Sequence, residues 1–550
     1  MSDFRSAEIE GILQGPPSRF AFRLLRALLD AWPDHAARDE AIRRAVRALE
    51  RWPARTRHVE VRYGEAMSAL LSRPSWPLAR SLRWTAMASS DDEEIGRAIA
   101  DLASDPNSRH LRRLALENPD DEVLQQLPMP TCFPNLVRLS LELGCDNRRV
   151  TLIPLLNSGL PASLRYLTLA NTENLDDGRS DDVPEIVDAI VLSPVGRRLR
   201  AVCLPNMSDA TLARFLEKFR WPLSDIGHQT WTMESLGRLL HHHALVSELE
   251  RLNLQALHVG LEGVVMLARC PNLGRLERLN LAGNSLGPEG AAVLTRSAFV
   301  SNLRRLNFFD NPLGDDGWEV LARAPFRRLR SLALCYTGAT ALGARSFARS
   351  QSLGSLRSLT LNGNELRDEG LSEIFGARFV MQLRHINIAA TGKSAATAEI
   401  LASRPLERLR ALDLASDRGG AEFGRQLARS SVFTTLAYLD LQGLDLGDEG
   451  VASLAGATGF PSLQRLSLWG NGLTSRGVRA LAASPFLSSI RALSLRGNPE
   501  IDDEGALALA ESPYLRNLID LDFHLDCNHV SPECLKILRH SPSMSLLNAI

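Results

Sequence analysis

Apolar residues recur along this chain with a period of 26 to 28 residues over residues 249–518. Each unit opens with the pattern L-x-x-L-x-L, and such alternation is typical of a short strand with one buried face. In the unit that begins at Leu276, we expect Leu279 and Leu281 to point into the core and Asn280 and Ala282 to point outward. The clearest units begin at Leu276, Leu303, Leu356, Leu436, Leu463 and Ile490, and weaker ones at Leu249, Leu329, Leu383, Leu409 and Leu518. This constant period predicts a solenoid of stacked units.

An asparagine follows the strand in five of the six clear units. Its amide can hydrogen-bond to backbone groups that would otherwise be buried without partners, in its own unit and in the neighbouring one. Stacked copies therefore predict a ladder of buried asparagines, formed by Asn284, Asn311, Asn364, Asn471 and Asn498. Other residues stand at this position in the middle units, where we expect the ladder to be interrupted: Thr337, Thr391, Asp417 and Leu444.

A second signal, L-x-[D/P/S]-x-G, precedes a predicted helix of about ten residues. Its polar residue is well placed to cap that helix, and in one unit Pro288 fits the first helical turn. The capping candidates are Asp315, Asp368, Asp448, Asp503 and Ser475. We expect the glycine of this signal, such as Gly370 or Gly450, to allow the helix to approach the strand closely. Several helices are predicted to end near a proline: Pro325, Pro405, Pro485 and Pro513.

Upstream, the period loosens but persists. Strand-like segments open at Leu111, Leu136, Leu164, Leu199 and Leu223, and two weaker ones contain Val59 with Val61 and Leu82 with Trp84. Residues 19–32 and 36–52 read as two amphipathic helices, which can cover the exposed end of the first repeat. These patterns predict a helical N-terminal cap over residues 1–55, irregular repeats over 56–248, and regular repeats with a C-terminal cap over 249–550.

Composition narrows the function classes. The 63 basic and 64 acidic residues nearly cancel, so we expect neither a nucleic-acid nor a membrane partner. The N-terminus lacks a signal-peptide pattern, no apolar run reaches membrane-spanning length, and the seven cysteines show no paired spacing. These features predict a cytoplasmic monomer. The basic residues are arginines except for Lys218, Lys393 and Lys536, a bias that favours a GC-rich, bacterial genome.

Residues 111 to about 540 resemble leucine-rich repeats of the ribonuclease-inhibitor-like class, which also occurs in Ran GTPase-activating proteins. The signature L-x-x-L-x-L-x-x-N-x-L, the helix after it and the unit near 27 residues carry this resemblance. It implies an α/β fold, a right-handed solenoid shaped as a horseshoe with parallel strands on the concave face and helices on the convex face. It also implies that partner proteins bind mainly to the concave face and its rim.

The outward positions of the predicted strands are the candidate binding residues. Large aromatic side chains and arginines at exposed positions are enriched among binding hot spots. The alternative is that each aromatic residue only covers the neighbouring strand. The candidates are Arg278, Arg305, Phe309, Tyr336, Asn362, Tyr438, Asp440, Arg465, Trp469 and Arg496.

Three patterns suggest other chemistry. Gly392, Lys393 and Ser394 match the tail of a phosphate-binding loop, but Asn387 stands where the leading glycine belongs. The run 241–243 of three histidines fits an exposed helix end better than a metal site, because adjacent helical residues point in different directions. The C-terminal set His524, Cys527, His529, Cys534 and His540 has zinc-ligand types without the spacing of a common zinc site. We therefore expect no catalytic residue, metal or cofactor.

The favoured function is a non-catalytic scaffold that binds a partner protein on the concave strand face. The reason is that the repeats occupy nearly the whole chain and leave no room for a separate catalytic domain. One alternative is a regulator of a small GTPase, of the GTPase-activating type, because some proteins with similar repeats have this role. Another is a bacterial effector delivered into a host cell, which the scarcity of lysine would also fit.

Overall fold

The computed structural model describes residues 9–14, 17, 19–32, 35–61, 67–85, 98, 100–117, 129–143, 153, 155–157, 159–171, 183–204, 209–218, 223, 225–228, 232–523 and 528–541. Contacts within the chain divide it into two compact units, Met1–Asn253 and Leu254–Ile550. Each unit alternates parallel strands with helices.

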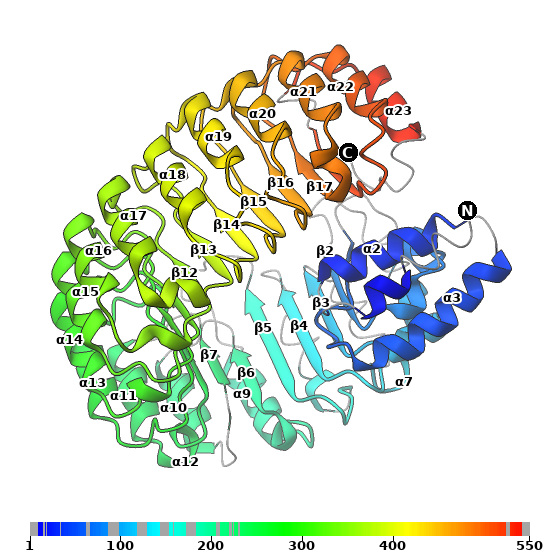
Figure 1. Cartoon of the computed structure of the whole chain (residues 1–550). Helices are drawn as coiled ribbons and strands as arrows, with labels where there is room; N and C mark the ends of the chain where they lie inside the picture. Colours follow the sequence, from blue (N-terminus) through cyan, green and yellow to red (C-terminus); the bar gives the residue numbers. More distant parts are fainter. Residues whose placement is uncertain are drawn as a thin grey trace. The chain divides into compact units, whose positions relative to one another are not determined.

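The C-terminal unit stacks one strand and one helix per repeat, with the strands on the inner side of an arc and the helices on the outer side (Figure 1). Each strand pairs in parallel with the strand of the next repeat. The strands are β9 (Arg278–Asn280), β10 (Arg305–Asn307), β11 (Ser331–Ala333), β12 (Ser358–Thr360), β13 (His385–Asn387), β14 (Ala411–Asp413), β15 (Tyr438–Asp440), β16 (Arg465–Ser467), β17 (Ala492–Ser494) and β18 (Asp520–Asp522). The helices are α13 (Gly260–Arg269), α14 (Pro288–Thr295), α15 (Gly314–Arg323), α16 (Ala341–Ala348), α17 (Arg367–Gly376), α18 (Ala395–Ser403), α19 (Gly420–Ala428), α20 (Gly447–Ala455), α21 (Ser475–Ala482), α22 (Asp503–Ala510) and α23 (Pro532–His540).

The core of this unit lies between the strands and the helices. The middle residue of each strand is a leucine, or Ile386 in β13, and pairs in register with its counterpart, as Leu279 does with Leu306; both of these are buried. Leu281 is buried as predicted, but Ala282 is buried too, so its predicted outward orientation is wrong. The reason is that the three-residue strand ends at Asn280, and the period-two alternation ends with it.

The asparagine ladder is present and fully buried. The Asn311 amide nitrogen donates to the carbonyl oxygens of Leu281 at 2.8 Å and Phe308 at 3.0 Å. Its amide oxygen accepts from the backbone N–H groups of Asn284 at 3.1 Å and Leu286 at 2.9 Å. One asparagine therefore satisfies polar backbone groups of two repeats.

The predicted interruption of this ladder is confirmed in part. Within the described residues, the side chains of Thr337 and Thr391 accept no hydrogen bond from a backbone N–H of the preceding repeat. The hydroxyls of Thr337 and Thr391 donate to the backbone carbonyl three residues earlier, as the asparagines do. The Asp417 carboxylate accepts from the N–H groups of Thr391 at 3.1 Å and Gly392 at 3.0 Å. At Leu444, as at Leu257 in the repeat that begins at Leu249, the side chain at this position cannot form a hydrogen bond.

The polar residues of the second signal cap the helix of the following repeat, not their own helix as predicted. Asp315 lies in the first turn of α15, and its carboxylate accepts from the N–H groups of Thr340 at 2.7 Å and Gly343 at 2.9 Å, at the start of α16. Parallel stacking places the first turn of one helix beside the N-terminus of the next, where negative charge is favoured. The same contact is made by Asp368 to α18, Asp448 to α21, Ser475 to α22 and Asp503 to α23.

The glycines of this signal allow close packing between helices, whereas the sequence predicted packing of a helix on a strand. A Cβ atom on Gly370 would lie 3.0 Å from the Cα of Ala341 in the preceding helix. A Cβ on Gly450 would lie 3.2 Å from the Cα of Ala421. Two other predictions are confirmed: Pro288 opens α14, and the helices before Pro325, Pro405, Pro485 and Pro513 end two or three residues earlier.

The N-terminal unit repeats the parallel pairing with longer strands and more irregular helices. Its strands are β1 (His58–Val61), β2 (Ser81–Thr85), β3 (Arg113–Glu117), β4 (Arg138–Leu143), β5 (Tyr166–Asn171), β6 (Ala201–Leu204), β7 (Asp225–His228) and β8 (Arg251–Asn253). Its helices are α2 (Arg19–Asp30), α3 (His35–Ala48), α4 (Met67–Leu71), α7 (Met129–Cys132), α9 (Val183–Leu192), α10 (Asp209–Lys218), α11 (Met233–His241) and α12 (His243–Val246). Every upstream strand expected from the sequence is therefore confirmed, including the two weakest, β1 and β2.

The two predicted N-terminal helices are confirmed as α2 and α3. The Asp30 carboxylate at the end of α2 accepts from the N–H and the hydroxyl of Ser75, both at 2.9 Å. Ser75 directly precedes the short 3-10 helix Trp76–Leu78, which leads into β2. These bonds attach α2 to the first repeats. Among the described residues, no helix combines the length and the apolar composition needed to span a bilayer.

We expect the protein to lose stability as the pH falls from 6.5 to about 4, because of His58 in β1. Burial, and secondly the charge of Arg19, lower the pKa of His58 to about 4 in the folded state. The unfolded chain binds a proton at the ordinary pKa of 6.5, so within this window the unfolded state binds more protons and is favoured. The loss is at most about 3 kcal/mol. Urea denaturation at several pH values should show this slope in the native protein and in His243→Gln. The slope should be smaller in His58→Gln, where the lowered pKa values of His110 and His385 still contribute in the same direction.

Candidate protein-binding surface

The strand face of the C-terminal unit consists of the outward side chains of β9–β18 and of the two or three residues that follow each strand. All ten candidate residues lie on this face or at its edge. Arg278, Arg305, Phe309, Tyr336, Arg465 and Trp469 are exposed, and Asn362, Tyr438, Asp440 and Arg496 are half-buried. Register places Arg278 beside Arg305 on β9 and β10, and Tyr438 beside Arg465 on β15 and β16.

Phe309 and Tyr336 form an exposed aromatic pair at the ends of β10 and β11. Their ring centroids lie 5.5 Å apart in an edge-to-face arrangement, with 71° between the ring planes. The side chains remain 41% and 51% exposed. The Tyr336 ring also lies against Gly363 of the next repeat, where a Cβ atom would come within 2.4 Å of it. Glycine is favoured at position 363 for two reasons: its φ of +72° lies in the left-handed region, and the absence of a side chain leaves the space that the Tyr336 ring occupies.

Trp469 follows β16 and is arranged similarly. Its indole lies over Gly497 of the next repeat, where a Cβ atom would come within 2.4 Å of the indole nitrogen. The Arg496 guanidinium stands 5.0 Å from the ring centroid, a cation–π contact. The indole nevertheless stays 38% exposed. Each of these rings thus covers part of the neighbouring repeat with some of its surface, and the rest of the ring remains exposed to solvent.

Acidic and phenolic groups occupy the middle of the strand face. The Tyr438 hydroxyl donates to Asp440 at 2.7 Å, and the Asn387 amide donates to Asp413 at 2.6 Å. Burial raises the pKa of Tyr438 first, with the hydrogen bond to Asp440 adding to the effect. Burial also raises the pKa of Asp413, assisted by the nearby charge of Asp440. This part of the face is therefore polar and already internally hydrogen-bonded.

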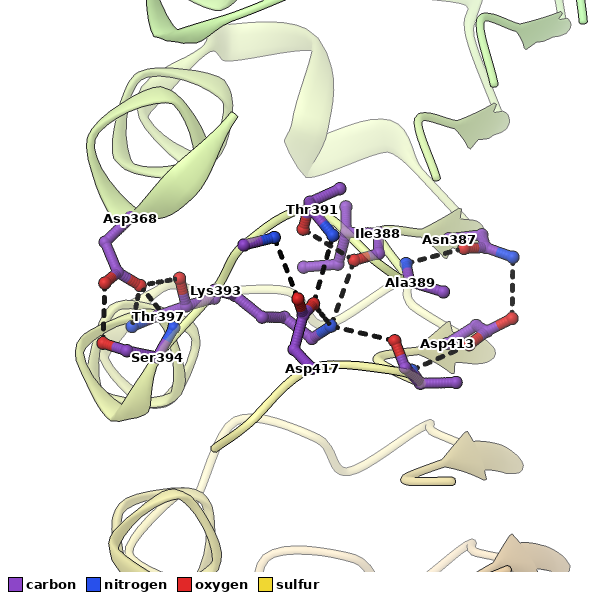
Figure 2. A network of polar contacts seen from close by, with 12 residues as sticks. Asp368, Asn387, Ile388, Ala389, Thr391, Lys393, Ser394, Thr397, Asp413 and Asp417 are labelled. Atoms are coloured by element: carbon purple, nitrogen blue, oxygen red, sulfur yellow. Dashed lines mark hydrogen bonds and ion pairs between the residues drawn. The ribbon is translucent and has the colours of Figure 1, made fainter. Parts of the chain in front are cut away.

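A buried ion pair that was not predicted from the sequence lies just behind this face. Lys393 is buried, and its amine donates to the carbonyl oxygens of Ile388 at 3.3 Å and Ala415 at 3.1 Å and forms an ion pair with Asp417, as Figure 2 shows. Lys393 replaces the buried leucine found at this position in other repeats, such as Leu366. Asp417 replaces the ladder asparagine of the next repeat. Aligning the repeats residue by residue would have revealed both substitutions together.

This contact also explains the phosphate-loop fragment 392–394. The Lys393 amine is occupied by protein oxygens, and Ser394 caps α18, its hydroxyl donating to Asp368 at 2.6 Å (Figure 2). Burial lowers the pKa of Lys393, while the hydrogen bond to Asp417 opposes that change. These residues therefore serve the packing of the repeat.

The histidine candidates also have local structural roles. His241 contacts the Gly237 carbonyl at 2.7 Å at the end of α11, and His242 accepts from the Leu245 N–H at the start of α12. In the C-terminal set, the Cys534 thiol donates to the Asp503 carbonyl at 3.6 Å, whereas His524 and Cys527 lie outside the described residues. Over the described ranges, no group of three or more His, Cys, Asp or Glu residues is arranged to hold a metal ion.

Comparisons with known proteins agree with this repeat structure. A family model described as "Leucine Rich repeat" matches residues 276–294, 301–322, 355–375, 434–455, 461–482 and 486–510. A search of curated protein sequences finds no match.

Several solved structures are similar in part, each at low sequence identity. The Rad7–Elc1 complex from yeast contains a chain with 15% identity and a TM-score of 0.40, with 70% of this chain and 86% of that chain covered. The mouse RP105/MD-1 complex matches at 15% identity and a TM-score of 0.37, covering 84% and 85%. A TLR13–ssRNA13 complex matches at 15% identity and a TM-score of 0.37, covering 86% and 66%.

Each segment that the family model matches contains parts of the strand, ladder and helix unit described above. Leucine-rich repeats generally serve as scaffolds for protein–protein interaction. The six matches and the parallel strands alternating with helices identify this chain as a leucine-rich repeat protein with an α/β repeat fold.

Proposed function

We propose that this protein is a non-catalytic scaffold that binds a partner protein on the strand face of its C-terminal unit. The observation that carries the proposal is the position of the exposed aromatic residues. Phe309, Tyr336 and Trp469 each lie two or three residues after a strand of this face, in the turn that leaves the strand. The exposed large aliphatic side chains of the described residues lie on α-helices or 3-10 helices instead: Leu192, Leu261, Leu342, Met381, Leu507 and Ile537.

The arrangement of these aromatic residues favours binding. Phe309 and Tyr336 hold each other, and Trp469 is held between Arg496 and Gly497, so little side-chain entropy remains to be lost on association. Aromatic residues and arginines are the residue types that contribute most of the binding energy in protein interfaces. The exposed Arg278, Arg305 and Arg465 add positive charge along the same face.

The proposal includes the ribonuclease-inhibitor-like class and the cytoplasmic location expected from the sequence. The class is supported by an α-helix in every repeat from α13 to α22 and by the unit of 26 to 28 residues. The helical cap over residues 1–55 belongs to the same proposal and is supported by the bonds from Asp30 in α2 to Ser75.

The test is a triple variant, Phe309→Ala with Tyr336→Ala and Trp469→Ala. Partners are first captured on the full chain and identified by mass spectrometry, and the affinity of a purified partner is then measured by calorimetry. We expect the triple variant to bind about 100-fold more weakly or worse, because each buried aromatic hot spot contributes about 2 kcal/mol.

A matched control removes three exposed leucines from the helices: Leu261→Ala, Leu342→Ala and Leu507→Ala. This variant loses similar apolar area away from the strands, and we expect its affinity to stay within about twofold of the native value. Equal affinity of the aromatic triple variant and the native protein would rule out the strand face as the binding surface.

A further inference from the structure

A basic cavity of about 390 Å³ lies within the N-terminal unit. Arg57, Arg80, Arg112, His110 and Asn135 line it, and Glu50 is the one carboxylate among its lining residues. Each of the three arginines directly precedes a strand: Arg57 precedes β1, Arg80 precedes β2 and Arg112 precedes β3. They stand at equivalent positions of successive repeats, because the N–H of Arg80 donates to the Arg57 carbonyl at 3.0 Å and that of Arg112 to the Arg80 carbonyl at 2.8 Å.

Arg57 is the most enclosed of these side chains, with 3% of its surface exposed. Its Nε donates to the Leu78 carbonyl at 2.8 Å and its Nη1 to the Leu49 carbonyl at 3.0 Å. Its Nη2 is buried and has no hydrogen-bond partner among the described residues. A buried guanidinium nitrogen without an acceptor is costly, so this donor lacks an oxygen that a bound ligand can supply.

The positive charge in this cavity is not neutralised by ion pairs. Within the described ranges, neither Arg57, Arg80 nor Arg112 forms an ion pair. Burial, followed by repulsion from Arg80 and Arg112, lowers the pKa of Arg57 to about 9. Burial and the same arginine cluster lower the pKa of His110.

A structural role explains only part of this cluster. The Arg80 guanidinium donates to the carbonyls of Pro77 at 2.9 Å and Ala79 at 2.7 Å, and Arg357 caps the turn before β12 in the same way. In the C-terminal unit, Arg304 at this register pairs with Glu277 at 3.0 Å, whereas Arg357 stands between two arginines of adjacent repeats, as Arg80 does. The stack of arginines therefore occurs in both units, and the N-terminal cluster is distinguished by the enclosed Arg57 and its buried Nη2 without an acceptor.

We propose that this cavity binds the phosphate group of a small molecule. The planar guanidinium groups suit bidentate contacts to phosphate oxygens, and one such oxygen would satisfy the free Nη2 of Arg57. The cavity volume lies at the lower end of the range of small-molecule sites. It therefore leaves room for an organic group attached to the phosphate.

The experiment uses inorganic phosphate and glycerol phosphate as probes, with acetate as a carboxylate arm, by calorimetry on the full chain at constant ionic strength. We expect 1:1 binding with a Kd of about 1 mM or lower for at least one phosphate probe, and binding of acetate at least about tenfold weaker. Tighter binding of glycerol phosphate would assign the site to a phosphate ester, and tighter binding of inorganic phosphate to the free ion.

Arg112→Met should weaken phosphate binding by about tenfold or more, because one charge-assisted contact is lost. Because Arg112 is exposed, its replacement should leave the fold intact. The Arg112→Lys variant keeps the positive charge but loses the planar guanidinium, so it should bind phosphate with intermediate affinity. Arg109→Met is the matched control, since exposed Arg109 lies beside His110 in the sequence but does not line the cavity. Three results would each overturn the proposal. They are no binding at phosphate-probe concentrations up to about 10-fold above the expected Kd, acetate binding as tight as phosphate binding, and an equal loss of phosphate affinity in Arg109→Met.

Discussion

Replacing Lys393 by methionine is expected to lower the free energy of unfolding by about 3–5 kcal/mol. The methionine side chain fills most of the same space but leaves the largely buried Asp417 carboxylate without its counterion. It also leaves the carbonyl oxygens of Ile388 and Ala415 without the Lys393 donor. An uncompensated buried charge is the main cost, because water cannot solvate it there.

Urea denaturation followed by circular dichroism measures this loss, and amide hydrogen exchange over residues 383–440 locates it within the repeat array. Lys218→Met is the matched control. Lys218 also pairs with an aspartate, Asp188, at 2.7 Å, but its side chain is partly exposed, so the expected cost is below about 1 kcal/mol.

The double variant Lys393→Leu with Asp417→Asn introduces the residues found at these positions in other repeats, such as Leu366 and Asn364. We expect it to be at least as stable as the native protein, because replacing a buried ion pair by well-packed neutral groups is often neutral or stabilising by about 1–4 kcal/mol. A double variant as unstable as Lys393→Met would show that the ion pair is not the source of the loss.

The second large effect is expected for Asn311→Ala, which should cost about 4 kcal/mol. Asn311 is buried, and the alanine variant leaves the buried N–H groups of Asn284 and Leu286 without an acceptor. It also removes the donor to the carbonyl oxygens of Leu281 and Phe308. Because these groups belong to two repeats, the loss of hydrogen-exchange protection should extend across both.

Asn302→Ala is the control for this variant. Asn302 also links two repeats, since its amide donates to the Gly274 carbonyl at 2.9 Å, but this bond is exposed to solvent. Water can replace the lost donor, so we expect a cost below about 1 kcal/mol. A similar loss of stability in both asparagine variants would contradict the importance given to the buried ladder.

The sequence alone determined the repeat and its buried positions. Leucines such as Leu279 and Leu306 return at a fixed period, and only one winding of the backbone places all of them in one core. The strand within the signature follows from its alternation of apolar and polar residues, and the turn follows from the hydrogen bonds of the asparagine amide. The helix after the turn follows from its local helix signals. For the same reason even the weak strands β1 and β2 could be predicted.

Contacts between repeats were decided only by the tertiary structure. Asp315 caps the helix of the next repeat, and Gly370 allows the helix of the preceding repeat to pack closely. Lys393 pairs with Asp417, 24 positions later in the sequence. A local pattern cannot distinguish a contact within a repeat from one made to its neighbour, because the stacking places equivalent residues of adjacent repeats side by side. The clustering of Arg57, Arg80 and Arg112 arises in the same way, since residues more than twenty positions apart in the sequence become neighbours only when the solenoid forms.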